Sequence, residues 1–390
     1  MPDTSQIAPL SAPIPAPAPA ARPVRPPMTI AVLVARYSIS GVPLAQVRLA
    51  RALAAEGHRV TILFGYADPE RRPAPIPGVE LRVWNKPKAR GLLRPLMRLL
   101  RRDRPDVVFS AEDHLNVLVL IAALLTGSKT KISVSSRVTP LDTYSNRPLT
   151  KRWVLKQLTR LTARRADALT CVSQDMVDQY RTMFGTGDRH QAIYNIVDDA
   201  DNRARRDEPV DEPWFAGGLG PVAVAAGSLQ PWKGFADAID AIALIRDQGR
   251  ALRLLILGEG PERATLEAQI ARLGLRNRVR LIGHVDNSLK YFARADLFVL
   301  SSHVEGLPNV LVEALMCGTA VVATDCPTGP REVLADGRFG RLVPMRDPAA
   351  LAAGMIDALD YPIDPALAAE AVRPFGAATI LDQHFQSLGL

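Results

Sequence analysis

Two glutamates separated by seven residues, Glu305 and Glu313, have a spacing that could do chemistry. They enclose the sequence EGLPNVLVE, in which Asn309 is suited to cap a following helix. The free N–H groups and positive dipole end of such a helix start bind a diphosphate. Glu313 then lies roughly 6 Å along the axis, about one turn into the helix. Because carboxylates accept hydrogen bonds from sugar hydroxyls, the two could hold a hexose and a ribose.

Strands and helices alternate in the part of the chain that precedes this segment. A strand at 28–35, a glycine-containing loop, a helix at 43–57 and a strand at 58–64 make a βαβ unit. The alternation continues with strands at 105–110, 131–136, 166–173 and 192–195 and helices at 115–126 and 148–166. Strict alternation indicates a parallel sheet covered by helices on both faces.

The same pattern restarts after a polar interruption. Residues 198–212 contain almost no apolar side chain, which predicts an exposed linker. Five more strands are then expected, at 221–227, 252–258, 278–283, 296–302 and 319–325. We therefore predict an α/β protein with two Rossmann-like, doubly wound domains that face a central cleft. In such sheets, ligands bind beyond the carboxyl ends of the strands.

Size and composition agree with two globular domains. The chain has 390 residues, of which 47% are hydrophobic, and its longest apolar run, 117–125, is about half of a membrane span. Residues 1–27 are dominated by Pro and Ala and lack the pattern of a secretory signal, which predicts a disordered tail. Three cysteines without metal-binding spacing are expected to be reduced thiols. We expect a cytoplasmic protein that does not span the membrane.

The net charge of +8 is concentrated locally. Between Lys86 and Arg104 there are eight basic residues and one acidic residue, with leucines recurring among them at helical spacing. A basic helix with an apolar stripe suits an anionic membrane surface, which we favour over nucleic acid as a partner. The alternative is an ordinary solvated helix whose stripe lies in the core, and Pro95 weakens the helical periodicity.

Several motifs together resemble a known family. EGLPNVLVEAL followed by GTAVVATD is similar to the EX7E motif of the family-four glycosyltransferases, and GSLQPWKGF, LLILGEGPE, GHV and a final helix occur in that family's order. The resemblance extends from residue 28 to the C-terminus. It implies the GT-B fold, a retaining reaction, and neither metal nor cofactor. The one DxD triplet of the chain, at 199–201, lies in the polar segment 198–212 and not directly at the end of a predicted strand, in agreement with metal independence.

The resemblance also implies roles for residues of the second domain. Glu313 would bind the ribose hydroxyls of a nucleotide, and Glu305 the donor sugar. The backbone N–H groups of Gly306 and Leu307 would contact the pyrophosphate. Lys233 would neutralise the diphosphate leaving group, as a fixed ammonium stabilises charge that grows in the transition state.

Five further residues are expected at the site by the same resemblance or by their place at strand ends. Gly41, in the first βα loop, would let the backbone approach the diphosphate closely. Gly283 and Arg331 would lie at the donor, although a structural role for Arg331 is about as credible. His114 matches a position near donor sugar and acceptor, and could equally be a helix cap. Arg137, after the strand at 131–136, is expected to contact an anionic acceptor.

The chain departs from the family pattern at two positions. Ser228 stands where the family usually carries an arginine, so Lys233 is left without its second cation unless Arg331 or Arg36 substitutes. The first loop also has one glycine, Gly41, where a pair is expected. Both departures concern phosphate contacts and leave the fold prediction unchanged.

The resulting domain assignment is a tail at 1–27, an acceptor-binding domain at 28–200, a linker at 201–212, a nucleotide-sugar-binding domain at 213–373, and a helix at 374–390 returning to the first domain. The expected donor is a UDP-sugar. The loop TDCPTGPREVL is similar to the group that builds bacterial exopolysaccharide or lipopolysaccharide, which implies a lipid-linked saccharide acceptor at the cytoplasmic membrane face.

Three other functions are alternatives to this one. A nicotinamide-dependent oxidoreductase needs GxGxxG, and the nearest candidate, at 258–261, lacks the third glycine. A glycosidase could use paired carboxylates but would not need a diphosphate-binding helix and Lys233. A non-catalytic nucleotide-sugar-binding partner protein on the same fold stays open because of Ser228.

Overall fold

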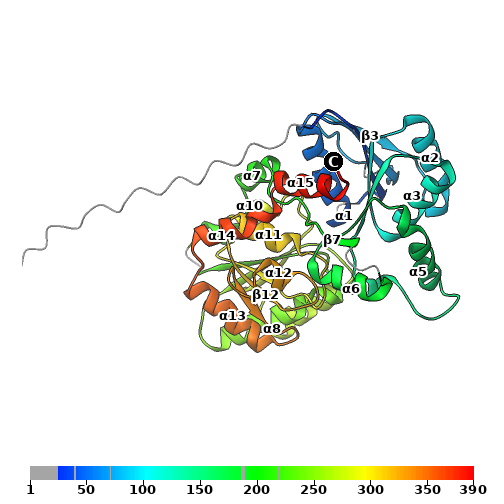
Figure 1. Cartoon of the computed structure of the whole chain (residues 1–390). Helices are drawn as coiled ribbons and strands as arrows, with labels where there is room; N and C mark the ends of the chain where they lie inside the picture. The colour runs from blue at the N-terminus through cyan, green and yellow to red at the C-terminus, as the bar shows by residue number, and fades with distance from the viewer. Residues whose placement is uncertain (1–24, 39–40, 71, 186–188, 218–219) are drawn as a thin grey trace, which may run out of the picture.

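Two parallel sheets, each covered by helices, make up the computed structural model (Figure 1). The described residues are 25–38, 41–70, 72–185, 189–217 and 220–390. In Figure 1 the first sheet and its helices occupy the upper right, and the second sheet and its helices the lower left. The predicted fold class is confirmed. Most of the predicted N-terminal tail lies outside the described residues.

The first sheet has, within the described residues, seven parallel strands in the order β3-β2-β1-β4-β5-β6-β7. They are β1 (Thr29–Arg36), β2 (Arg59–Tyr66), β3 (Val79–Val83), β4 (Val107–Ala111), β5 (Lys131–Ser136), β6 (Ala168–Cys171) and β7 (His190–Ala192). The helices of this half are α1 (Gly41–Ala55), α2 (Leu93–Arg98), α3 (Asp113–Thr126), α4 (Pro140–Thr143), α5 (Lys151–Thr162), α6 (Gln174–Phe184) and α7 (Ala200–Arg206). Strands β1 and β4 are almost completely buried, as expected for parallel strands covered on both faces.

The second sheet has, in the part of the chain that is described, six parallel strands in the order β10-β9-β8-β11-β12-β13. They are β8 (Val222–Ala226), β9 (Arg253–Leu257), β10 (Val279–Gly283), β11 (Leu297–Leu300), β12 (Ala320–Thr324) and β13 (Arg341–Val343). The helices of this half are α8 (Phe235–Asp247), α9 (Arg263–Arg272), α10 (Leu289–Phe292), α11 (Asn309–Met316), α12 (Pro330–Val333), α13 (Pro348–Asp360) and α14 (Pro365–Val372). Helix α15 (Ala377–Ser387) follows them in the chain.

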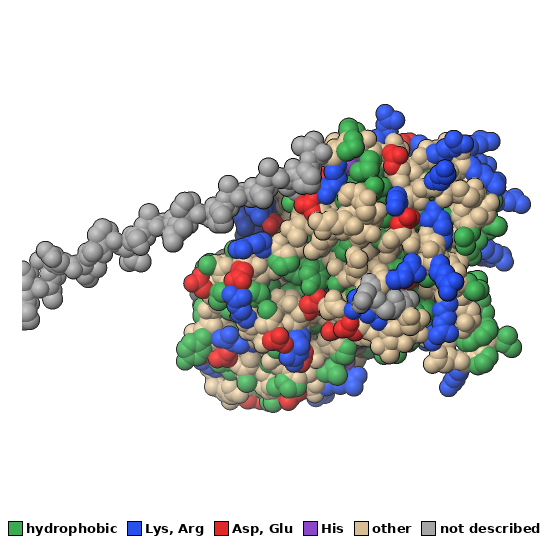
Figure 2. All heavy atoms as spheres, in the orientation of Figure 1, with side chains coloured by type: hydrophobic (Ala, Val, Ile, Leu, Met, Phe, Trp, Pro, Cys, Tyr) green, Lys and Arg blue, Asp and Glu red, His purple; other side chains and the backbone are tan. Residues whose placement is uncertain are grey.

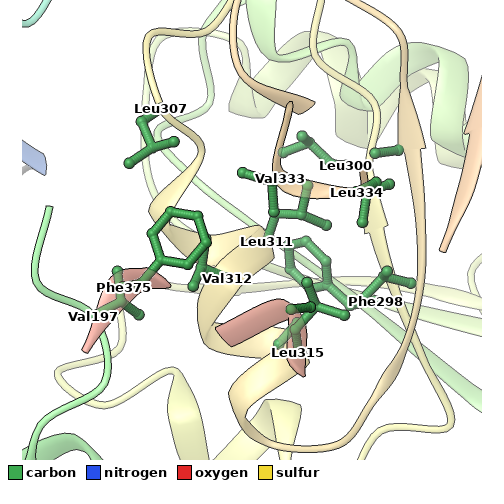
Figure 3. Close-up of a cluster of buried hydrophobic side chains, with 14 of the residues drawn as sticks. Val197, Phe298, Leu300, Leu307, Leu311, Val312, Leu315, Val333, Leu334 and Phe375 are labelled. Carbon is green, nitrogen blue, oxygen red and sulfur yellow. The ribbon is translucent and has the colours of Figure 1, made fainter. Parts of the chain in front are cut away.

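The two halves share buried apolar contacts. One continuous hydrophobic cluster contains Val172 and Val197 of the first half together with Leu307, Leu311 and other residues of the second. Figure 3 shows Leu307 and Val197 on either side of Phe375, next to α11. The last helix, α15, packs on the first sheet, where its apolar face joins the core of β1, β2 and α1. The chain therefore crosses between the halves twice.

Two segments near these crossings differ from the sequence predictions. Residues 201–212 are not simply an exposed linker, because α7 occupies 200–206 and Asn202 is buried at 1% exposure. Asn202 donates to the carbonyl of Val197, which fixes the segment to the crossing. Arg25, within the predicted tail, pairs with Asp382 of α15 at 2.9 Å. Both segments are ordered by contacts with residues distant in sequence.

The basic stretch 86–104 also differs from its favoured interpretation. It forms a 3₁₀ turn at Ala89–Leu92, then α2, then a π turn at Leu99–Asp103. Four of its five leucines are buried in the core against α3 and the fifth, Leu93, is half-buried, so the apolar stripe is not available to a membrane. The basic side chains remain exposed, and Figure 2 shows Lys and Arg gathered over this side of the first half. None of the described helices is both long and apolar enough to cross a bilayer.

Candidate active site

Each sheet reverses its strand order at one place, between β1 and β4 in the first sheet and between β8 and β11 in the second. Such a switch point leaves a crevice at the carboxyl ends of the strands, where ligands bind in open α/β sheets. Lys233 follows β8 and Glu305 follows β11. Gly41 follows β1 and His114 follows β4. Four of the sequence-predicted residues therefore lie at the two switch points.

Lys233 and Glu305 form an ion pair at the second switch point. Lys233 Nζ lies 2.6 Å from Glu305 Oε1, and Ser302 Oγ donates to the same oxygen at 2.6 Å. The lysine loop is held against the glutamate loop, since Ser301 Oγ donates to the Lys233 carbonyl at 3.0 Å. A Cβ at Gly234 would lie 1.9 Å from the Ser301 carbonyl oxygen, so only glycine permits this approach. Local packing thus places the cation beside the carboxylate.

The loop after Glu305 lies against the first half. Thr328 Oγ1 donates to the carbonyls of Glu305 and Gly306 at 3.0 and 2.8 Å, which fixes the loop's shape. A Cβ at Gly306 would lie 2.7 Å from the Arg137 carbonyl oxygen, so the two halves touch at this point. Among the described residues, the N–H groups of Gly306 and Leu307 find no acceptor. They are suited to a ligand oxygen.

Helix α11 starts without a side-chain cap. The residue before it is Pro308, and the prediction that Asn309 caps the helix is wrong. Asn309 Oδ1 instead accepts a hydrogen bond from Asn195 Nδ2 of the first half at 2.9 Å. The side chain is drawn away from the helix start by a contact between the halves, which sequence alone does not show.

Glu313 meets a residue that the sequence analysis did not identify. Arg48 Nη2, from α1 of the first half, lies 2.7 Å from Glu313 Oε1. The two side chains are only 12% and 8% exposed, so this is a buried ion pair across the cleft. Arg48 lies seven residues after Gly41, two turns along the same helix face, and that spacing was an available signal.

Arg137 lies between the halves. Its guanidinium donates to Asn195 Oδ1 and, at 3.2 Å, to Gln46 Oε1. Burial lowers its pKa to about 10, and its Nε–H has no acceptor among the described residues. Contact with an anionic acceptor stays a prediction. The unpaired Nε–H is a group that such an acceptor could satisfy.

The two predicted glycines differ in what their backbones require. Gly41 is the first residue of α1, and a Cβ there would meet nothing within 4 Å. Residues 39–40 of its loop lie outside the described residues. Gly283 ends β10 with φ 93°, and a Cβ would lie 3.1 Å from Glu259 Oε1. The positive φ therefore accounts for a glycine at 283, whereas no contact of a Cβ with another described residue accounts for a glycine at 41.

The two arginines suggested as a second cation beside Lys233 have other partners in the structure. Ser228 is exposed. Arg331 is 56% exposed and pairs with Asp325 and, at 3.0 Å, with Asp336. Arg36 lies over an aromatic ring of β2, 5.0 Å from its centroid. Both of Arg331's carboxylate partners would have to be displaced before it could act on a donor.

Glu112 lies beside His114 and was not identified from sequence. His114 Nε2 is 3.5 Å from Glu112 Oε2 at the end of β4. Burial raises the pKa of Glu112 to about 7, and burial lowers the pKa of His114. A carboxylic acid that titrates near neutrality at a switch point is a candidate for proton transfer. Its position directly after a strand was the available signal.

We expect Glu112→Gln to flatten the pH dependence of stability. The raised pKa means that the folded protein retains the proton longer than the unfolded chain. The stabilising effect of the neutral acid is therefore complete below about pH 4.5 and is lost as pH rises through about 7. The loss between pH 5 and 8 should be about 1–3 kcal/mol smaller in the variant.

Urea unfolding at pH 5, 6, 7 and 8 measures this difference. Glu70→Gln, at an exposed glutamate of the same half, is the matched control and should keep the wild-type dependence. Equal slopes for wild type and Glu112→Gln would contradict the assignment.

Glu332 makes another polar contact between the halves. Its carboxylate accepts hydrogen bonds from the backbone N–H of Gln174, at 2.8 and 3.0 Å, and from the Tyr194 hydroxyl at 2.5 Å. Gln174 is the first residue of α6, so the carboxylate lies at a helix N-terminus, which favours its charge. Burial nevertheless raises the pKa of Glu332. No local sequence pattern indicates this contact.

The fold and site define a GT-B-type protein, and comparisons with known proteins identify the family. The profile of a glycosyl transferase 4-like domain matches residues 40–195, and that of glycosyl transferases group 1 matches residues 220–361. The chain belongs to the family-four glycosyltransferases. The described residues contain no group of three or more His, Cys, Asp or Glu side chains that could hold a metal ion.

Curated relatives agree with this family. The chain is 30% identical over 249 residues to N-acetylgalactosamine-N,N'-diacetylbacillosaminyl-diphospho-undecaprenol 4-alpha-N-acetylgalactosaminyltransferase of Campylobacter jejuni, covering 63% of this chain and 65% of that protein. It is 27% identical to an uncharacterized glycosyltransferase of Methanocaldococcus jannaschii, covering 61% of this chain and 60% of that one. The matches thus span less than two thirds of these relatives.

Solved structures show the same fold. HepE of Anabaena, in complex with UDP, has a TM-score of 0.71 at 21% identity and covers 93% of this chain and 100% of its own. The lipopolysaccharide outer core galactosyltransferase WaaB has a TM-score of 0.68 at 16% identity, with 93% and 99% covered. At these identities the likeness concerns the fold alone.

Proposed function

We propose that this protein transfers a sugar, with retention of configuration, from a nucleotide-diphosphate sugar to a saccharide acceptor. The observation that carries the proposal is the Lys233–Glu305 pair at the second switch point, next to the uncapped start of α11. Glu313 lies one turn further along this helix and faces the first half. A cation, free N–H groups and two carboxylates are thereby arranged for a diphosphate between two sugars.

The reaction needs no covalent enzyme intermediate. The bond between the anomeric carbon and the diphosphate oxygen breaks, and the acceptor hydroxyl oxygen bonds to that carbon on the same face. The hydroxyl proton passes to the leaving diphosphate. Lys233 stabilises the growing negative charge, and contact between the halves excludes water that would hydrolyse the donor. UDP is the proposed nucleotide, supported by the HepE complex of the same fold.

The proposed acceptor is a lipid-linked saccharide at the cytoplasmic face of the membrane. The Campylobacter relative carries a diphospho-undecaprenol acceptor in its name, and a 35% identical relative over 146 residues, LpsE of Rhizobium meliloti, is a lipopolysaccharide core biosynthesis glycosyltransferase. The exposed cations of the first half are suited to anionic lipids and to a diphosphate. Peripheral membrane association is part of this proposal.

A second candidate is a non-catalytic nucleotide-sugar-binding partner protein. Ser228 favours it, because the second cation expected at the diphosphate is missing there. This candidate requires donor binding without turnover, which distinguishes it from the transferase in one experiment.

A panel of nucleotide sugars should identify the donor. We expect one UDP-sugar to raise the Tm of the wild-type protein and to be consumed when membrane extract is added. Glu313→Ala should lose the thermal shift, because the ribose hydroxyls lose their acceptor. The exposed Glu70→Ala serves as the control and should bind like wild type.

The two proposals give different results in this panel. Binding without consumption, in extracts that support a known transferase, would favour the partner protein. The absence of any stabilising nucleotide sugar would contradict both proposals.

A further inference from the structure

Exposed apolar side chains gather on one part of the first half. Of the thirteen exposed large apolar residues in the described part of the chain, five lie between the end of β5 and the end of α5: Val138 at 48%, Leu141 at 69%, Leu149 at 88%, Val154 at 43% and Leu161 at 74%. Single exposed leucines are ordinary, whereas a contiguous exposed apolar patch is typical of an interaction site. We call residues 138–161 the α4–α5 projection.

The projection is an ordered structure that holds its leucines outward. Tyr144 anchors it, being 3% exposed and packed edge-on against two aromatic rings of α6. Arg152 donates to the carbonyl of Leu141 at 2.7 Å, and Lys156 Nζ donates to Asn146 Oδ1 at 2.6 Å. Figure 1 shows the chain between α4 and α5 extending outward from the body of the first half. The exposed leucines are therefore fixed by the fold.

Helix α5 continues the apolar surface. Thr150 caps it by accepting a hydrogen bond from the N–H of Trp153 at 3.1 Å. Val154, Leu158 and Leu161 follow at i, i+4 and i+7, which places them on one face. The first and last of the three are exposed and Leu158 is half-buried. The face therefore carries a stripe that the described part of the chain leaves uncovered.

Cations surround this apolar surface. Residues 138–165 contain seven Lys and Arg and one acidic residue. The exposed ones are Arg147, Lys151, Arg152, Arg160 and Arg164. Residues 28–200 contain 27 Lys and Arg against 15 Asp and Glu, whereas residues 201–390 contain 19 against 24. The positive charge therefore belongs to the half that bears the projection, and Figure 2 shows apolar side chains at its outer edge with Lys and Arg beside them.

We propose that the α4–α5 projection docks this protein on an anionic lipid bilayer. The proposal rests on the proposed function, because it says which surface brings the cleft to a lipid-linked acceptor. The projection carries exposed aliphatic side chains with Lys and Arg beside them. Such a surface is suited to the boundary between lipid headgroups and acyl chains. A protein partner would have to present an acidic and concave surface to the projection. Nothing in the described part of the projection specifies such a partner.

The position of the projection agrees with this role. It begins at Val138, the residue after Arg137, whose carbonyl oxygen lies against Gly306 of the donor-site loop. A bilayer contacted at Val138 and Leu141 would therefore lie at the mouth of the cleft. The stretch 86–104, by contrast, has four of its five leucines buried in the core and can offer a membrane charge but no apolar insertion.

Flotation with vesicles of phosphatidylcholine and phosphatidylglycerol tests the proposal on the full chain. One variant replaces the two most exposed leucines of α4 and its following loop, Leu141→Ser and Leu149→Ser. Another removes three exposed charges, Arg147→Gln and Lys151→Gln in the projection and Arg164→Gln just after it. A matched control removes three exposed charges of the other basic stretch, Arg94→Gln, Arg98→Gln and Arg102→Gln.

We expect wild type to bind anionic but not pure phosphatidylcholine vesicles. The leucine variant and the projection charge variant should each bind roughly tenfold or more weakly. The control, with the same net charge as the projection charge variant, should lose less than threefold. All replaced residues are exposed, so circular dichroism and Tm should match wild type.

Three results would overturn the proposal. They are equal losses from the two charge variants, unchanged binding by the leucine variant, and no binding of wild type to anionic vesicles. Self-association of wild type that the leucine variant abolishes, without vesicle binding, would instead assign the projection to a protein contact. Donor-induced thermal shifts, measured on the same variants without vesicles, report the proposed function separately.

Discussion

Lys233→Met is expected to lower turnover roughly 10²–10³-fold while weakening donor binding much less. The methionine keeps the apolar stem of the lysine and removes the ammonium that faces Glu305 at 2.6 Å. Ser228 supplies no second cation. The negative charge on the leaving diphosphate is therefore stabilised by the Lys233 ammonium without the help of an arginine at 228. The measurement is release of the nucleoside diphosphate under saturating donor, together with donor affinity by calorimetry.

Two further variants separate chemistry from folding. Lys233→Met leaves Glu305 with Ser302 as its remaining side-chain partner, so circular dichroism must show that the variant is folded. Lys233→Arg keeps the charge and should keep the fold and most donor binding. Lys88→Met, at an exposed lysine of the first half, should behave like wild type. Turnover of Lys233→Met within threefold of wild type would contradict the role of Lys233.

Arg48→Met is expected to destabilise the donor-free protein by about 3 kcal/mol, because it leaves the buried Glu313 carboxylate without its partner. In this variant, hydroxyl groups of a bound donor can donate hydrogen bonds to Glu313 in place of Arg48. The same donor should therefore raise the Tm of Arg48→Met more than it raises the Tm of wild type. In wild type, the donor must compete with Arg48 for Glu313. Urea unfolding with and without donor measures both effects.

A double-mutant cycle tests whether the two residues act together. Arg48→Met should cost much less in a Glu313→Gln background, with an interaction energy of about 1–3 kcal/mol. Arg51→Met is the matched control on the same helix, since Arg51 pairs with Asp201 at 2.7 Å but is partly exposed. If Arg48→Met lowered the free energy of unfolding no more than Arg51→Met does, the prediction that the Arg48–Glu313 ion pair stabilises the donor-free protein would be wrong.

Most of the fold is readable from local patterns, because buried parallel strands are continuous apolar runs bounded by turn residues. Strand β1 is predicted at 28–35 and observed at Thr29–Arg36, and β5 is predicted and observed at 131–136. Strands β3 and β13 were not predicted. Both are short edge strands, and β3 alternates half-buried with exposed residues, so neither gives a continuous apolar signal.

The part of the site that sequence alone determined is the part that is local to one sheet. Lys233, Glu305 and the start of α11 follow neighbouring strands β8 and β11, so strand order and turn chemistry suffice to bring them together. Contacts between the halves were decided only by tertiary structure. Arg48 reaches Glu313 across 265 positions of the sequence, and no periodicity encodes that distance.

The same reason explains the two basic segments. Both 86–104 and 138–161 combine leucines with Lys and Arg, and composition does not distinguish them. The first is buried by α3, which covers Leu92, Leu96, Leu99 and Leu100, whereas the second is left uncovered at Leu141 and Leu149. Sequence therefore determined that this protein has apolar and basic segments. Only packing between distant elements decided which of them faces solvent.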